Sequence, residues 1–229
     1  MLSQEELKKR AGVYAADFVK SGSTIGLGTG STVYWLIDEL GKRVKLGLQI
    51  TIVPTSDQTS ALAKKNGITV SSLDEVDQLS LTIDGADEID PRGQLIKGGG
   101  GALLREKIVA SASQELIIIA DSSKLVTELG KFPLPVEVIT FGYKQAKQKI
   151  IQSGFCKEVR LREKNGNVFI TDHQHYILDC FCEKIPDPSL VNHVLHLIPG
   201  VVETGLFINM ASKAIIGFED GRLEEINFK

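Results

Sequence analysis

The chain has 229 residues, and its 26 lysines and arginines against 29 aspartates and glutamates give a formal net charge of −3 at pH 7. This near balance creates no strongly positive surface, so we exclude nucleic acid as the main partner. With 42% hydrophobic and 24% charged residues, the composition is that of an ordinary globular protein rather than a disordered, collagen-like or membrane-embedded one.

The start of the chain and its cysteines bear on cellular location. No stretch approaches the ~20 apolar residues of a membrane span, and the opening segment MLSQEELKKR lacks the apolar core of a signal peptide. Cys156, Cys180 and Cys182 are an odd number in a long chain, which favours free thiols in a reducing compartment. We therefore expect a cytoplasmic protein with no membrane partner.

Strand and helix patterns alternate through the first 130 residues. An amphipathic helix is predicted over 7–18, followed by strands at 24–27, 49–53, 68–70, 79–84 and 116–120, with helices at 33–40, 57–66 and 102–113 between them. This alternation predicts an α/β fold with a mostly parallel, Rossmann-like sheet that is covered by helices on both faces.

The pattern changes after 131–136 (KFPLPV), where two prolines punctuate the chain. The elements predicted beyond this point are a hairpin from 156–162 and 167–171 around Asn165-Gly166, a strand at 176–181 and a helix at 188–197. We expect a smaller α+β domain over 131–206 and an α/β catalytic domain over 1–130 and 207–229. The apolar segments 204–208 and 214–216 are expected to return to the first sheet.

The loop Gly28–Thr32 (GTGST) follows the first predicted β-strand and precedes a helix. Glycines let the backbone approach an anion, and a helix start offers free N–H groups and the positive end of the helix dipole. The spacing is neither that of a P-loop nor that of the dinucleotide fingerprint, because Ser31 or Val33 stands where the third glycine would be. By itself the loop is either an anion site or a tight turn with an N-cap serine.

Two further segments carry candidate catalytic groups. Asp84 and Asp87 follow an apolar strand in the sequence DGADE, where they serve acid and base chemistry or form a solvated turn. Four glycines, Gly98–Gly101, follow Lys97 at a predicted helix start, and this arrangement is costly in chain entropy unless the backbone approaches a ligand closely. Glu106, about one turn into that helix, is either a base or a partner in a surface ion pair.

These loops, together with Asp121–Lys124, fall at the carboxyl ends of predicted parallel strands or at the helix starts that follow. Ligands of open α/β sheets bind beyond this edge. A phosphate at one glycine-rich helix start, and an anionic intermediate at the other beside aspartate, lysine and glutamate, would suit proton transfer on a small sugar phosphate.

Five segments carry a resemblance to a known family: GLGTGSTVYWLIDEL, TIDGADEID, IKGGGGALLREKIVA, DSSKLVTELGKFPLPVEV and IPGVVETGLF. Their order and spacing over almost the whole chain resemble those of the type A ribose-5-phosphate isomerases. The resemblance implies an intramolecular oxidoreductase that interconverts D-ribose 5-phosphate and D-ribulose 5-phosphate through an enediolate, in the non-oxidative pentose phosphate pathway. It further implies no metal, no organic cofactor and a homodimer or homotetramer.

The resemblance also implies a role for each matched residue. Glu106 would be the base that carries a proton between C2 and C1, while Asp84 and Asp87 would contact sugar hydroxyls and assist ring opening. Lys97 and the glycine N–H groups would stabilise the enediolate oxygen. The residues implied to bind substrate are Thr29, Gly30, Ser31, Thr32, Asp84, Gly85, Ala86, Asp87, Lys97, Gly98, Gly99, Gly100, Lys124 and Lys8.

Other functions compete with this one. A sugar-phosphate-sensing domain without catalysis has a similar fold, but the roughly 20 residues before the first predicted strand leave no room for a helix-turn-helix. A CoA transferase with a glutamate nucleophile fits DGADE less well, and a dinucleotide enzyme using Asp57 would lack its third glycine. His173, His175, Cys180 and Cys182 have zinc-binding side chains, but Cys-x-Cys is typical of two residues on one strand face, so we expect no metal.

Overall fold

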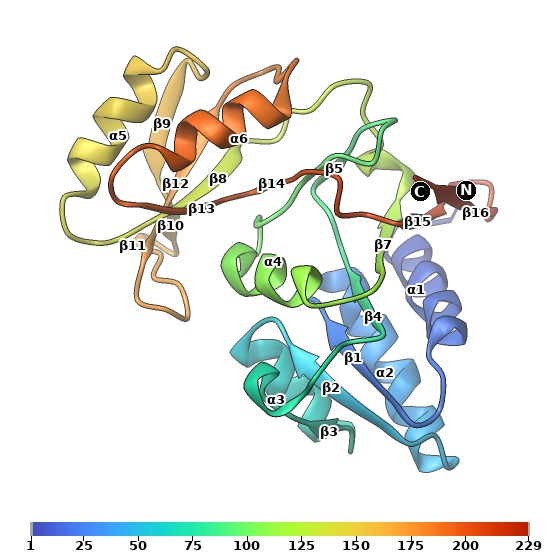
Figure 1. The fold of residues 1–229 in the computed structure, drawn as a ribbon. Helices are drawn as coiled ribbons and strands as arrows, with labels where there is room; N and C mark the ends of the chain where they lie inside the picture. Colours follow the sequence, from blue (N-terminus) through green and yellow to red (C-terminus); the bar gives the residue numbers. More distant parts are fainter. Residues whose placement is uncertain (1, 229) are drawn as a thin grey trace. The chain divides into compact units, whose positions relative to one another are not determined.

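The computed structural model describes residues 2–228, which form two compact units. The first unit comprises the chain up to Ala86, Arg105–Leu125 and the stretch from Met210 onward, and the second comprises Asp87–Leu104 and Val126–Asn209. The chain therefore passes between the units four times, after residues 86, 104, 125 and 209 (Figure 1). The domain boundaries predicted from the sequence, at 130/131 and 206/207, stay predictions.

The first unit contains a seven-stranded sheet in the order β16-β15-β7-β4-β1-β2-β3. Its neighbouring strands are parallel, apart from the antiparallel pair β15 and β16. The strands are β1 (Ser23–Leu27), β2 (Ile50–Pro54), β3 (Thr69–Val70), β4 (Leu81–Asp84), β7 (Leu116–Asp121), β15 (Lys213–Gly217) and β16 (Leu223–Asn227). The predicted α/β fold with a mostly parallel sheet is confirmed.

The helical segments of this unit are α1 (Gln4–Ala15), η1 (Ala16–Phe18), α2 (Ser31–Lys45), α3 (Asp57–Lys65), η2 (Leu73–Glu75), η3 (Ser122–Lys124) and α4 (Leu103–Ser111) from Arg105 on. Helices α1 and α2 pack together on one sheet face, where Ala11 and Leu36 share a buried core with Ile25 of β1 (Figure 1). The next residue of β1 faces α4, since a Cβ on Gly26 would lie 2.5 Å from Val109 Cγ1. Alternate strand residues thus meet helices on opposite faces.

The second unit contains three small sheets, in the orders β13-β8-β12-β9, β14-β6-β5 and β10-β11. The strands are β5 (Glu88–Ile89), β6 (Leu95–Ile96), β8 (Leu134–Val138), β9 (Glu158–Leu161), β10 (Glu163–Lys164), β11 (Asn167–Val168), β12 (Tyr176–Phe181), β13 (Val201–Thr204) and β14 (Leu206–Phe207). Its helices are α5 (Tyr143–Gln152) and α6 (Pro188–His196), and both bury one face against the four-stranded sheet.

Two expectations for the later part of the chain are corrected by the strand pairings. The segment 204–208 does not return to the first sheet, because β14 pairs with β6 of the second unit, whereas β15 does return and pairs with β7. The hairpin around Asn165-Gly166 is limited to β10 and β11, and β9 pairs with β12 instead. The turn itself has φ values of 55° and 78°, the two left-handed residues that a tight two-residue hairpin requires.

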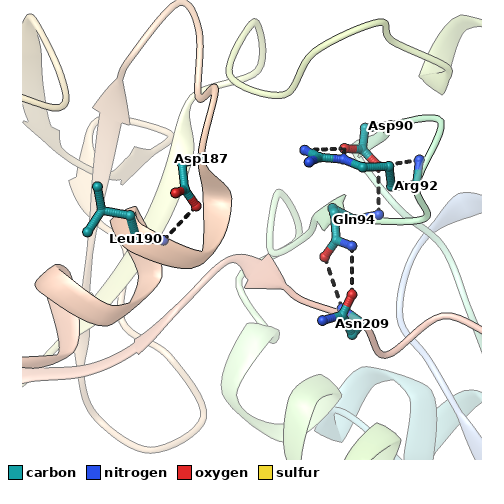
Figure 2. A network of polar contacts seen from close by, with 6 residues as sticks. All are labelled: Asp90, Arg92, Gln94, Asp187, Leu190 and Asn209. Carbon is teal, nitrogen blue, oxygen red and sulfur yellow. Dashed lines mark hydrogen bonds and ion pairs between the residues drawn. The ribbon is translucent and has the colours of Figure 1, made fainter.

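The connection between β5 and β6 is closed by a buried carboxylate. Asp90 Oδ1 accepts the backbone N–H groups of Arg92 at 2.9 Å and Gln94 at 2.8 Å (Figure 2). The Gln94 side-chain amide donates to Asn209 Oδ1 at 2.9 Å, and its Oε1 accepts the backbone N–H of Asn209 at 2.9 Å (Figure 2). Asn209 has a φ of 54°, so these two hydrogen bonds hold a left-handed residue just beyond the end of β14.

Among residues 2–228, no helix combines the length and apolar character that a membrane crossing demands.

Candidate active site

Three of the predicted site loops lie at one edge of the first unit's sheet. Strands β7, β4 and β1 are adjacent and parallel, and their carboxyl ends lead into Ser122–Lys124, Gly85–Ala86 and Gly28–Thr32, respectively. This is the edge where ligands of open α/β sheets bind. The structure therefore brings together loops that are far apart in the sequence.

Asp84 lies directly beneath the GTGST loop (Gly28–Thr32). Its side chain is 1% exposed, and Oδ1 accepts the backbone N–H groups of Gly85 at 2.7 Å and Thr29 at 3.2 Å. A Cβ on Gly28 would lie 1.8 Å from the same oxygen, so a glycine is needed there for the carboxylate to occupy this place. Two backbone donors and one glycine thus fix the orientation of Asp84.

Thr29 also joins a cluster of hydroxyl groups that the sequence analysis did not identify. Its Oγ1 lies 2.8 Å from Thr55 Oγ1 and from Ser56 Oγ, and 3.1 Å from Thr59 Oγ1. Thr59 donates to the carbonyl oxygen of Gly28 at 2.8 Å. From the sequence this stretch is only a predicted helix over 57–66; Ser56 caps that helix by accepting the N–H of Thr59, and no signal in the sequence revealed the further role of these hydroxyl groups.

Removal of one hydroxyl should weaken this cluster measurably. We expect Thr59→Val to lower the free energy of unfolding by about 1–3 kcal/mol, because the change keeps the shape and deprives the buried Gly28 carbonyl of its donor. Urea unfolding of the variant measures this, with Thr59→Ser as the control that retains the hydroxyl. Equal stability of the two variants would contradict a role for the hydroxyl.

The start of α2 offers donors for an anion. Both the N–H and the hydroxyl of Thr29 are engaged inside the protein, so the candidate donors are the N–H groups of Gly30, Ser31 and Thr32 and the hydroxyl of Ser31. Gly30, at the N-cap, has a φ of 128° and supplies no capping side chain, and Ser31 is exposed. The uncapped helix start and the positive end of its dipole suit a phosphate group.

Glu106 lies in the first turn of α4, and only 3% of it is exposed. The far end of this helix meets the start of β4, where Gln114 N–H donates to the carbonyl oxygen of Leu79 at 3.0 Å. Near its beginning, the Arg105 side chain donates to Asp57 Oδ1 at 2.7 Å, at the first residue of α3. The first turn of α4 therefore lies at the carboxyl edge of the sheet, and a buried carboxylate at that edge can act as a general base.

Two lysines complete the candidate residues of the first unit. Lys124 is half-buried and ends the short helix η3, whose N-cap, Asp121, accepts the N–H of Ser123 at 3.1 Å. The other carboxylate oxygen of Asp121 accepts the side-chain amide of Gln4 at 3.3 Å. Lys8, also half-buried, is one turn further along α1 on the same face as Gln4.

The remaining candidate residues belong to the second unit. Asp87 Oδ2 accepts the backbone N–H of Gly99 at 2.8 Å, which joins the second DGADE aspartate to the loop Gly98–Gly101. The loop begins with a turn in which Gly101 N–H donates to the carbonyl oxygen of Gly98 at 3.0 Å. Gly98 has a φ of 99°, which favours glycine, while Gly99 and Gly100 are exposed.

Lys97 precedes this turn and is 2% exposed. Its backbone N–H donates to the carbonyl oxygen of Gly205 at 2.9 Å, and its ammonium nitrogen lies 5.2 Å from the centroid of the Phe207 ring. A buried ammonium group is costly in free energy unless other groups stabilise it, and a cation over an aromatic ring is one such arrangement. The Lys97 side chain is thus buried against the Phe207 ring, next to the Gly98–Gly101 loop.

Glu88, the last acid of DGADE, has a structural role. It is 3% exposed, and its two carboxylate oxygens accept the backbone N–H groups of Gly130 at 2.7 Å and Phe132 at 2.6 Å. The motif thus contains a carboxylate that anchors the segment 130–132 as well as two that are candidates for chemistry.

The histidines and cysteines weighed as a zinc site have separate partners. His175 Nδ1 lies 3.0 Å from Glu137 Oε1, whereas the Cys180 thiol donates to the carbonyl oxygen of Leu178 at 3.7 Å and the Cys182 thiol to that of Cys180 at 3.6 Å. Within residues 2–228, no group of three or more histidine, cysteine, aspartate or glutamate side chains is arranged to hold a metal ion.

Comparison with known proteins identifies the family. A family model described as ribose 5-phosphate isomerase A (phosphoriboisomerase A) matches residues 51–221. A curated ribose-5-phosphate isomerase A from Bacillus mycoides is 62% identical and covers 94% of this chain and 97% of its own length.

Solved structures agree with the sequence relatives. The ribose 5-phosphate isomerase from Plasmodium falciparum has a TM-score of 0.94 at 41% identity, over 97% of this chain and 98% of that one. A D-ribose-5-phosphate isomerase solved in complex with phospho-erythronic acid also has a TM-score of 0.94, at 38% identity over 99% of this chain and 100% of that one. The chain therefore belongs to the ribose 5-phosphate isomerase A family of isomerases.

Proposed function

We propose that this chain interconverts D-ribose 5-phosphate and D-ribulose 5-phosphate by moving a proton between C2 and C1 through an enediolate. The observation that carries the proposal is the 62% identity to a curated ribose-5-phosphate isomerase A over nearly the full length of both chains. The buried carboxylate of Glu106, near the sheet edge that carries the GTGST loop, supplies the type of group that this chemistry needs.

The roles in the proposed reaction are those that the family resemblance implies for each matched residue. Glu106 takes the proton from C2 of the open-chain aldose and returns it to C1, while the carbonyl and hydroxyl oxygens exchange one proton. Asp84 and Asp87, both held by backbone N–H groups, bind sugar hydroxyls and assist ring opening. Lys97 and the glycine N–H groups stabilise the negative oxygen of the enediolate.

Substrate phosphate is assigned to the first unit. The N–H groups at the start of α2 (Gly30, Ser31 and Thr32) and the ammonium groups of Lys124 and Lys8 provide donors and positive charge. The reaction moves only protons, one from C2 to C1 and one between the two oxygens, so carboxylate, ammonium and backbone N–H groups suffice, and we propose neither a metal nor an organic cofactor.

Solvent exchange tests the proposed function directly. Protein treated with a chelator and then dialysed is incubated with ribose 5-phosphate in D₂O, and ribulose 5-phosphate and deuterium at the exchanging carbon are measured together. Turnover with deuterium incorporation is the expected result. Ribose 5-phosphate that protects the fold against heating but is never converted would contradict the proposal and favour a sensing domain.

Lys124 gives a separate prediction about phosphate recognition. We expect Lys124→Ala to raise KM by about tenfold or more with a smaller change in kcat, since a charge-assisted hydrogen bond contributes about 1.5–3 kcal/mol. Steady-state kinetics measure both constants, and Lys131→Ala, at an exposed lysine a few residues along the chain, is the control. A large fall in kcat with unchanged KM would show that Lys124 acts in the chemical step instead.

Location and assembly also belong to the proposal. We place the protein in the cytoplasm, because its three cysteines are buried free thiols, which suit a reducing compartment. We propose a homodimer or homotetramer on the family resemblance, and light scattering coupled to gel filtration gives the mass that decides between them.

A further inference from the structure

In the second unit, the guanidinium group of Arg162 binds backbone carbonyl groups of the Gly98–Gly101 loop. Arg162, between β9 and β10, donates from Nη1 to the carbonyl oxygen of Gly98 at 2.7 Å and to that of Gly99 at 3.3 Å. Its Nε and Nη2 both donate to the carboxylate of Asp179 on β12, the Nε bond measuring 2.9 Å. The two side chains are only 12% and 19% exposed. The carboxylate therefore orients the planar guanidinium so that its other edge meets the loop.

An aromatic ring from the other side of the β10–β11 hairpin packs on the same loop. The N–H of Phe169 donates to the carbonyl oxygen of Arg162 at 2.9 Å, which ties the return strand of the hairpin to the residue that carries the guanidinium. A Cβ on Gly101 would lie 2.3 Å from the Phe169 ring, so the ring occupies the space beside that glycine. The Asn165-Gly166 hairpin thus carries a ring that packs against the loop.

The bonds to the two carbonyl groups determine where the neighbouring N–H groups point. A trans peptide is planar, with its C=O and N–H directed to opposite sides. The Gly98 carbonyl shares its peptide with the Gly99 N–H, and the Gly99 carbonyl shares its peptide with the Gly100 N–H. Both N–H groups are therefore aimed away from Arg162, and that of Gly99 is directed at Asp87 Oδ2. A cation at a carbonyl oxygen also polarises the peptide and strengthens its N–H as a donor.

We propose that Arg162, oriented by Asp179, is a positioning residue for the isomerisation. It fixes and polarises two peptides of the Gly98–Gly101 loop, of which the first supplies the Gly99 N–H that holds Asp87 and the second the Gly100 N–H that serves the enediolate. Without Arg162 the consecutive glycines regain backbone freedom. This inference rests on the proposed function, because it assumes that the Gly99 and Gly100 region serves the enediolate. Arg162 acts through the loop and is assigned no contact with the substrate.

The first test compares substitutions of two neighbouring arginines, Arg162 and Arg160. Arg162→Met should lower kcat for ribose 5-phosphate by about 10- to 100-fold and change KM by less than about threefold, because the lost interaction serves the transition state. Arg160→Met is the matched control, since Arg160 lies two residues earlier, is 62% exposed and forms its ion pair with Glu158 of the same strand. Wild type and control should turn over alike, and their activity tests the proposed function independently.

A binding measurement separates positioning from general damage. The carboxylate of phospho-erythronic acid is planar and negatively charged, and its two oxygens lie side by side as O1 and O2 of a cis-enediolate do, so its Kd should rise in Arg162→Met by a factor similar to the fall in kcat. The Kd of inorganic phosphate should stay within about twofold, since the phosphate donors lie elsewhere. Asp179→Asn should show the same pattern in milder form, and millimolar guanidinium should partly restore kcat in Arg162→Ala.

Three results would overturn the inference. These are an unchanged kcat in Arg162→Met, a rise in KM with kcat unchanged, and a loss of activity in both Arg162→Met and Asp179→Asn that matches a loss of folded protein in thermal unfolding. An inactive wild type would instead refute the proposed function, and the phospho-erythronic acid titration would still report whether Arg162 orients the loop.

Discussion

Glu106→Gln is expected to lower kcat for ribose 5-phosphate by about 10³-fold and to change KM by less than about threefold. The amide is nearly isosteric with the carboxylate but cannot accept the proton from C2. The side chain is buried in the first turn of α4, so water has little access to replace it as the base. Deuterium exchange into the substrate at equilibrium should fall by the same factor as turnover, because both depend on the same proton transfer.

Two further variants make this prediction specific. Glu115→Gln changes an exposed glutamate just beyond the same helix and should leave turnover unchanged. Glu106→Asp keeps a carboxylate but withdraws it by one methylene, and we expect an intermediate loss because proton transfer depends on placement within about 1 Å. If Glu106→Gln kept a near-normal rate, the base would have to be another residue.

Gly28→Ala is expected to lower kcat by about 100-fold, although it replaces no charged residue. The added Cβ would lie 1.8 Å from Asp84 Oδ1, closer than any contact allows, so the carboxylate must leave its place under the GTGST loop. Movement of Asp84 would break its bonds from Thr29 and Gly85. The backbone of Gly28 does not lie in the left-handed region, so the effect comes from the side chain and not from backbone strain.

Overpacking also reduces stability, and a control has to separate that effect from the loss of activity. Gly41→Ala on α2 is suitable, because its Cβ would lie 2.7 Å from the Asn66 side chain, at the far end of the helix from the loop. Both variants should lose about 1–3 kcal/mol of unfolding free energy, whereas only Gly28→Ala should lose most of its turnover. Similar losses of turnover in the two would contradict the placement of Asp84 as the cause.

The first unit was predictable from the sequence because its local signals agree with its packing. The parallel strands are short apolar runs, and the helices between them have periodic apolar positions and clear start signals such as Ser56 at the N-cap of α3. The loops that follow the strands were predicted as site loops because they contain glycines and acids that an ordinary helix start does not need.

Strand β8 could not be predicted because Pro135 lies within it. A proline gives no N–H to a ladder and argues against an interior strand. Here it pairs with Asp179 of β12, while the pairing with β13 on the other side begins only at Val136. The proline therefore precedes the residues of β8 that pair with β13, and the sequence alone does not reveal where that pairing begins.

The sequence also could not predict the two-residue strands, or the roles of side chains that depend on contacts with distant residues. β5 and β6 are too short to show periodicity, and the return of β14 to β6 rather than to the first sheet depends on long-range pairing. Arg162 resembles any other charged residue of a hairpin until its carbonyl and carboxylate partners are known. Thr59 likewise reads as an ordinary helical threonine.

The late position of β15 in the sequence has a consequence for synthesis on the ribosome. β15 is the parallel neighbour of β7, so the edge of that fully buried strand stays open until residues 213–217, about ninety residues further along the chain, are made. An open apolar edge invites pairing with other chains. A transcript that ends early, or a carboxyl-terminal fusion that slows pairing, should therefore yield aggregated chains rather than a partly active enzyme.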